Sequence, residues 1–144
     1  MSRPCVIVAL RDSDSVDGLV KLACQITASM DAELLAMHVV EVTPGLPLDA
    51  DAEVLDEPGK QILARAHQVA SEACSRQMAT QLVRARQAGE AIVGEAKDRN
   101  AEMLVMGYHG RHGLGEILLG STVQYVSHHA PCRVIVQIPA PPKR

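Results

Sequence analysis

The chain has 144 residues, of which 47% are hydrophobic and 22% charged, a composition typical of a soluble globular domain and not of a disordered chain. A formal net charge of −3 disfavours a domain built around a nucleic-acid backbone. The chain has two tyrosines and no Phe or Trp, so it is poorly suited to bind single-stranded nucleic acid by stacking bases on aromatic side chains. The sequence shows neither an apolar run of roughly 20 residues, as a membrane span needs, nor a signal-peptide pattern. We therefore expect one cytoplasmic domain over residues 1–144, with its core in 4–137 and a flexible tail at 138–144.

The first elements follow from short apolar runs that alternate with amphipathic stretches. Residues 5–10 form a continuous, β-branched run, which predicts a strand covered on both faces. Apolar residues then recur at helical spacing over 16–30, and Ser13, Asp14 and Ser15 are candidate caps for that helix. A second strand is expected over 33–40.

The next stretch, 41–57, contains two prolines and a glycine followed by five acidic residues, and predicts a solvated loop. Pro58 is suited to the first turn of a helix, so the second helix is expected to begin there. Residues 81–86 predict a weaker strand, in which Arg84 and Arg86 interrupt the apolar pattern as on a sheet edge. The remaining expected elements are a helix over 90–99, a buried strand over 103–106, a helix over 121–129 and a buried strand over 134–136.

Five strands alternating with four helices predict an α/β fold, a single-domain three-layer α/β/α sandwich around a five-stranded parallel sheet. The two most apolar of the predicted strands, 5–10 and 103–106, are expected at the centre of the sheet. Ligands of such sheets bind beyond the carboxyl ends of the strands, where the strand order reverses.

A glycine-rich stretch over 107–120 follows the strand at 103–106 directly and precedes a helix directly. In that position, backbone N–H groups can form a concave nest for phosphate. Gly120, Ser121 and Thr122 offer amides and hydroxyls at the helix start, and Arg111 adds a cation. The alternative is a flexible loop in which Ser121 is an ordinary N-cap. The stretch lacks the GxxxxGK[ST] pattern of a P-loop, so the sequence shows no P-loop lysine and no obvious Mg²⁺ ligand.

The spacing of these residues, G-x2-G-x9-G-S at Gly107, Gly110, Gly120 and Ser121, resembles the motif of ATP-binding universal stress proteins. The resemblance extends over residues 4–137. It implies a five-stranded sheet of order 3-2-1-4-5, an adenine nucleotide such as ATP (with or without Mg), and phosphates on the glycine loop. It also implies a homodimer formed through the last strand, over 133–138.

The same resemblance places Met106 and Val39 or Val40 near the adenosine, together with Leu10, Arg11 and Asp12 at the end of the first strand. Family members usually carry an Asp-Gly-Ser-like turn here, and this chain has Arg11 at the position of that Asp, with Asp12 one residue later. A cation at this position is expected to favour more phosphate or a different anionic ligand.

Other site types are less well supported. The six histidines show no HExxH or Cys/His quartet, so no metal site is expected, and the four cysteines are expected to be small buried hydrophobes. Ser121 lacks the GxSxG context of a hydrolase nucleophile. The sequence therefore favours a nucleotide-binding regulatory protein of the stress response. The alternatives are a homodimeric scaffold with a weak or altered nucleotide site and a slow ATPase or nucleotide hydrolase. Residues 35–44 also resemble stress domains attached to permeases, a resemblance that implies a permease as a partner.

Overall fold

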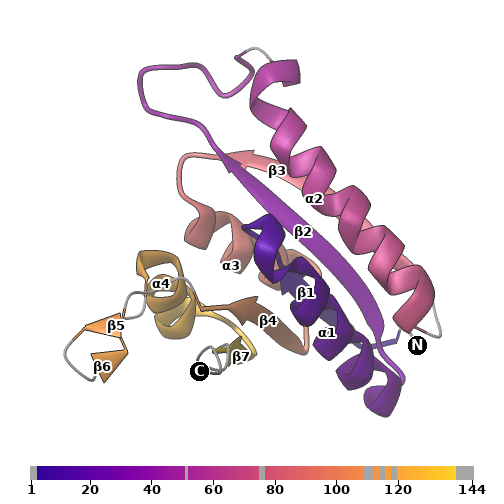
Figure 1. Cartoon of the computed structure of the whole chain (residues 1–144). Coiled ribbons are helices and arrows are strands. Elements are labelled where there is room, and N and C mark those ends of the chain that lie inside the picture. Colours follow the sequence, from indigo (N-terminus) through magenta and orange to yellow (C-terminus); the bar gives the residue numbers. More distant parts are fainter. Residues whose placement is uncertain are drawn as a thin grey trace.

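The computed structural model describes residues 3–50, 52–74, 77–108, 112–113, 116–117 and 120–138 (Figure 1). The main sheet has five strands. A separate two-stranded hairpin, which precedes the last helix in sequence, lies on the side of that helix away from the sheet. The strands are β1 (Cys5–Ala9), β2 (Glu33–Glu41), β3 (Met78–Ala85), β4 (Met103–Gly107) and β7 (Arg133–Gln137), and the hairpin strands are β5 (His112–Gly113) and β6 (Glu116–Ile117). The helices are α1 (Val16–Met30), α2 (Ala52–Ala73), α3 (Ala88–Asp98) and α4 (Ser121–His129), with a 3₁₀ turn at Ser13–Ser15.

All neighbouring strands of the main sheet are parallel, in the order β3-β2-β1-β4-β7. This confirms the expected order 3-2-1-4-5, with β7 as the fifth strand, and the expected pairing of β1 with β4 near the centre. The strand order reverses between β1 and β4. The register aligns Met37, Ala9 and Met106 in one row across β2, β1 and β4 near their carboxyl ends.

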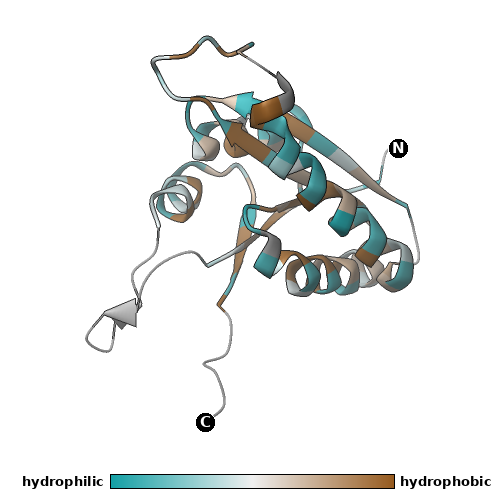
Figure 2. Cartoon of the chain, turned by 45° about the horizontal axis from the view of Figure 1, so that its top comes forward, coloured by the Kyte–Doolittle hydropathy of each residue, from teal (hydrophilic) through white to brown (hydrophobic). Residues whose placement is uncertain are grey.

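Side-chain alternation along the strands creates two hydrophobic layers, one on each face of the sheet. Val6 and Val8 of β1 pack into the cluster that α1 and α2 cover, whereas Ile7 and Ala9 pack into the cluster that α3 and α4 cover. Figure 2 shows the hydropathy of the chain, with many hydrophobic positions on the central strands and hydrophilic positions along the outer sides of helices. Both faces are covered, which explains why β1 and β4 are continuous apolar runs.

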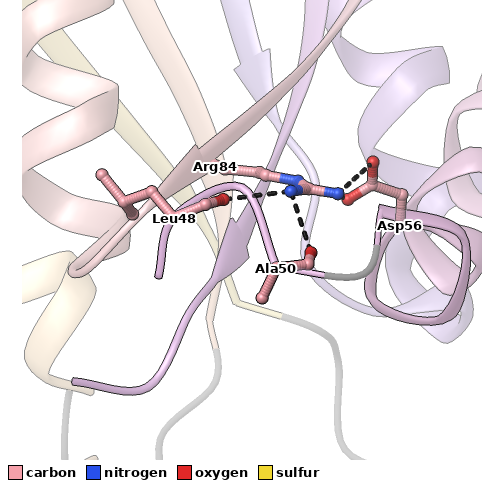
Figure 3. A network of polar contacts seen from close by, with 4 residues as sticks. All are labelled: Leu48, Ala50, Asp56 and Arg84. Carbon is pink, nitrogen blue, oxygen red and sulfur yellow. Dashed lines mark hydrogen bonds and ion pairs between the residues drawn. The ribbon is translucent and has the colours of Figure 1, made fainter. Parts of the chain in front are cut away.

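The start of α2 differs from the sequence prediction. The helix begins at Ala52 and contains Pro58, whereas the prediction began it at Pro58. Arg84 of β3 explains the difference, because its Nε and Nη2 donate to Asp56 Oδ1 and Oδ2, each at 3.0 Å (Figure 3). Its Nη1 also donates to the carbonyl oxygens of Leu48 and Ala50, at 3.0 and 3.1 Å. This tertiary anchor holds the first turns of the helix and outweighs the local preference of proline.

The edge position of β3 was predicted correctly, but its two arginines do more than interrupt the apolar pattern. Arg86 Nη1 donates to the carbonyls of Thr43 and Leu46, both at 2.6 Å. Together with Arg84 it ties the segment between β2 and α2 back onto the sheet edge. The stretch predicted as a solvated loop is thus exposed but held by hydrogen bonds between its backbone and two side chains.

Smaller differences concern element ends and caps. β2, β4 and β7 extend one residue beyond one or both ends of their predicted ranges, β3 begins three residues earlier and ends one earlier than predicted, and β1 ends one residue earlier. The helix α3 begins at Ala88 instead of residue 90. Ser15 lies at the N-cap of α1 but makes no capping bond there, because its hydroxyl donates to the Asp12 carbonyl at 3.1 Å. The β5–β6 pair within the glycine-rich stretch was not predicted.

The expectation of four small buried cysteine thiols is wrong for two of them. Cys24 of α1 and Cys74, just after α2, form a disulfide with a Cα–Cα distance of 5.0 Å. The two helices lie side by side on one face of the sheet, so residues 50 positions apart in sequence meet. Cys5 and Cys132 are free and partly buried.

On the surface, Arg65 of α2 also pairs with Asp17 of α1 and lowers the pKa of that carboxyl through its hydrogen bond.

Candidate functional site

A cavity opens at the carboxyl ends of β1, β2 and β4, on the face covered by α3 and α4. Its floor is the row formed by Met37, Ala9 and Met106, whose side chains lie between 0 and 8% exposed. The position follows from the topology, since the strand order reverses next to β1 and the helices on the two sides diverge there. The residues that line the cavity are Ala9, Leu10, Arg11, Met37, Val39, Glu41, Ala88, Ile92, Met106 and Thr122.

The cavity wall is apolar and its charged groups stand at the rim. Val39 and Ile92 form parts of the wall, whereas Arg11 and Glu41 are exposed residues at the ends of β1 and β2. Thr122, in the first turn of α4, contributes from the side of β4. An apolar hollow with a few polar groups is the usual form of a small-molecule site.

Val39 and Val40, which the sequence analysis gave as alternatives near the adenosine, differ in their position relative to the cavity. Val39 lines the cavity, and Val40 is 7% exposed and does not line it. The reason is the period of two along β2, which places Met37, Val39 and Glu41 on the face of the cavity. Four other predicted residues also lie around it, namely Leu10, Arg11, Met106 and Thr122.

Arg11 and Asp12, adjacent in sequence, reach different hollows. Asp12 lines a second depression on the α1 side of the sheet, which also contains Gly107 and Tyr108. Gly107 is the last residue of β4, and Tyr108 N–H donates to the Gln137 carbonyl at 2.9 Å, which keeps the chain beside β7 for one more residue. Of the predicted site residues that the structure describes, five line the cavity, Asp12 and Gly107 line the depression on the α1 side, and Val40, Gly120 and Ser121 line neither.

The start of α4 corrects the alternative in which Ser121 is an N-cap. The N-cap is Gly120, with extended backbone at φ −69° and ψ 165°, and Ser121 is the first helical residue. Gly120 has no side chain with which to cap this end, and Gln124 N–H donates to the Gly120 carbonyl at 3.0 Å. Because the first amides of a helix have no intrahelical partner, this end is suited to an anion. Gly110 and Arg111 lie outside the described residues.

Sequence reasoning missed the supports behind the site. His38 Nδ1 donates to the Leu10 carbonyl at 2.8 Å, which holds the chain just before Arg11. The ring has room because Gly59 of α2 faces it: a Cβ at that position would lie 2.6 Å from His38 Cδ2. The contact joins residues far apart in sequence, so no local pattern could have indicated it.

Two kinds of feature were not found in the described part of the chain. It contains no group of three or more His, Cys, Asp or Glu side chains arranged as around a metal ion. No helix among the described residues has both the length and the apolar character that crossing a membrane requires.

Comparison with known proteins decides the family. The model of the universal stress protein family matches residues 4–137. The chain belongs to this family. A universal stress protein of Methanocaldococcus jannaschii, MJ0531, is 34% identical over 137 residues, which cover 91% of this chain and 79% of that protein.

Two solved universal stress proteins share the fold and were determined with nucleotides. One, in complex with cAMP, has a TM-score of 0.71 at 24% identity and covers 97% of this chain and 100% of its own. The other, from Archaeoglobus fulgidus in complex with dAMP, has a TM-score of 0.70 at 18% identity, with 93% and 96% covered.

Proposed function

We propose that this universal stress protein binds an adenine nucleotide at the carboxyl edge of its sheet and acts as a regulatory protein in the stress response. The observation that carries the proposal is the apolar cavity at the point where the strand order reverses, next to a helix start whose N-cap is a glycine. Relatives of the same fold that were solved with cAMP and dAMP support the choice of adenine.

The proposed nucleotide lies with its base in the cavity and its phosphates toward α4. Met37, Val39 and Met106 supply apolar surface for a flat base. The amides at Gly120 and Ser121 supply donors for phosphate, as expected for the first turn of a helix. Gly107, Gly110 and Arg111 complete the phosphate side of the motif, and Asp12 shares the depression on the α1 side with Gly107.

The proposal is tested by mass spectrometry of any ligand released from the purified protein and by calorimetry with ATP, ADP and AMP. We expect at least one adenine nucleotide to bind at micromolar to low millimolar concentration. A homogeneous, folded protein that binds none of the three would contradict the proposal and favour a scaffold. Turnover well above slow background hydrolysis would favour the ATPase alternative.

Arg11 is expected to strengthen binding of the more highly phosphorylated nucleotides. Its guanidinium stands at the cavity rim and is exposed, so its attraction for phosphate is screened by water. Arg11→Asp should therefore weaken ATP binding by about fivefold or more, and AMP binding less. Lys21→Asp, an equal charge change on α1, is the control. Identical ATP-to-AMP ratios in the wild type and in Arg11→Asp would place Arg11 outside the ligand's reach.

We also propose that two copies pair through β7. This strand is an outer strand of the sheet, and Ile138 next to it is 44% exposed. An open apolar edge is a template for pairing with another chain, and two antiparallel copies would satisfy both edges.

We expect light scattering at micromolar concentration to show a dimer for the wild type and a larger monomer fraction for Ile138→Lys. Val54→Lys, at a 71% exposed position on α2, is the matched control. Ile135 is less suitable for the test because it packs against the core cluster under α1. A monomeric wild type would refute pairing through β7.

A further inference from the structure

Exposed hydrophobic side chains are concentrated between the end of β2 and the start of α2. Among the described residues, the large hydrophobic side chains that face solvent are those of Leu46, Leu48 and Val54, and of Ile138 beside β7. Leu46 is 44% exposed, Leu48 46% and Val54 71%. Figure 1 shows that this segment extends beyond the ends of β2 and β3. Single exposed hydrophobic residues are ordinary, but several in one place are typical of an interaction surface.

The backbone that carries these side chains is held in place. Arg86 Nη1 donates to the Leu46 carbonyl at 2.6 Å, and Arg84 Nη1 donates to the Leu48 carbonyl at 3.0 Å. The guanidinium of Arg84 also binds Asp56, so Leu48 and the start of α2 meet at one side chain. In Figure 3 the Leu48 carbonyl faces Arg84 and the Leu48 side chain points away from it. A segment held in this way loses little backbone freedom when a partner binds.

The charge around the exposed hydrophobic side chains is negative. Residues 41–57 include six acidic residues and no Lys, Arg or His, and one of the acids is paired with an arginine of β3. Asp49 follows Leu48 directly and is exposed. Glu57 is also exposed and lies three residues after Val54, on the same face of α2. Such a surface repels anionic lipids and nucleic acids and attracts Lys and Arg side chains.

We propose that Leu46, Leu48 and Val54, together with Asp49 and Glu57, form a docking surface for a basic amphipathic helix of a partner protein. Backbone carbonyls along the segment already accept hydrogen bonds from the two arginines of β3, so the segment offers few backbone groups to an added strand. A helix satisfies its own backbone and presents a row of apolar side chains flanked by basic ones. This inference does not depend on the bound nucleotide.

The hydrophobic part of the surface is tested with a labelled synthetic helix of about 15 residues, with leucines on one face and lysines on the other. Fluorescence anisotropy measures its binding to the wild type, Leu46→Ser, Leu48→Ser and Ile138→Ser. Ile138 is the matched control, since it is as exposed as Leu46 but lies beside β7, at the other edge of the sheet. We expect each leucine variant to bind about fivefold more weakly, and Ile138→Ser to bind as the wild type does. Thermal unfolding verifies that each variant is folded.

The acidic part of the surface is tested with the same probe. The double variant Asp49→Asn, Glu57→Gln is expected to bind it about threefold more weakly at low salt, with a smaller loss at high salt. The double variant Glu72→Gln, Asp98→Asn removes two exposed acids of the same kinds near the ends of α2 and α3, and should have the smaller effect. A helix with glutamate in place of lysine should not bind.

Three results with the probe would overturn the inference: no binding by the folded wild type, unchanged binding by both leucine variants, or equal binding of the lysine and glutamate helices. Anionic vesicles that bind the wild type more tightly than Leu48→Ser would also overturn it, because the surface would then contact a membrane. A dimer that is lost in Leu48→Ser, measured by light scattering, would overturn it in favour of a second copy of this chain.

Discussion

Replacement of Gly120 by valine is expected to reduce nucleotide affinity by about a hundredfold or more while the protein stays folded. Gly120 is the N-cap of α4, and the proposed phosphate site uses the amides at this helix start. Two hydrogen bonds from amides to a charged phosphate contribute about 3 kcal/mol or more, and a branched side chain beside them keeps the phosphate away.

The backbone at Gly120 is extended, with φ −69° and ψ 165°, so valine fits its conformation without strain. Calorimetry with ATP, alongside thermal unfolding, measures the two effects separately. Gly45→Val is the control, because a Cβ at Gly45 would meet nothing within 4 Å. A folded Gly120→Val protein with wild-type affinity would show that the phosphates do not lie on this helix start.

Loss of the Cys24–Cys74 cross-link is expected to lower the free energy of unfolding by about 4 kcal/mol. The bond joins residues 50 positions apart, so it restricts a long loop of the unfolded chain. In the folded protein it fastens α1 to α2 beside the buried cluster of that face. Urea unfolding with and without dithiothreitol measures the loss in the wild type, and the double variant Cys24→Ala, Cys74→Ala should show no dependence on reductant.

The thiol count provides an independent check on the same cross-link. Unfolded protein without reductant should expose two thiols, those of Cys5 and Cys132, and reduced protein should expose four. In the native protein both free thiols should react slowly at neutral pH, since burial raises their pKa. A variant with Cys5→Ala and Cys132→Ala should retain the reductant dependence of stability. Four reactive thiols in protein purified without reductant would disprove the disulfide.

The sequence by itself was sufficient to predict the α/β class and most element positions, because the periods of apolar residues are local. Continuous apolar runs marked β1 and β4 as strands covered on both faces, and Arg84 and Arg86 marked β3 as an edge. The strand order and the choice of Val39 or Val40 as alternatives came from the resemblance to a family, since neither is encoded in a local pattern.

The tertiary structure alone decided which side chains meet. Cys24 joins Cys74 because two helices share one face of the sheet, and α2 starts before Pro58 because Arg84 reaches Asp56 across 28 residues. Val39 faces the cavity and Val40 does not, because the register of β2 with β1 determines where along the sheet the alternation meets the cavity. Glu41 lines the cavity for the same reason, although the sequence assigned it no role in the site. Each of these contacts joins residues far apart in sequence or depends on strand register, and such contacts exist only once the sheet has formed.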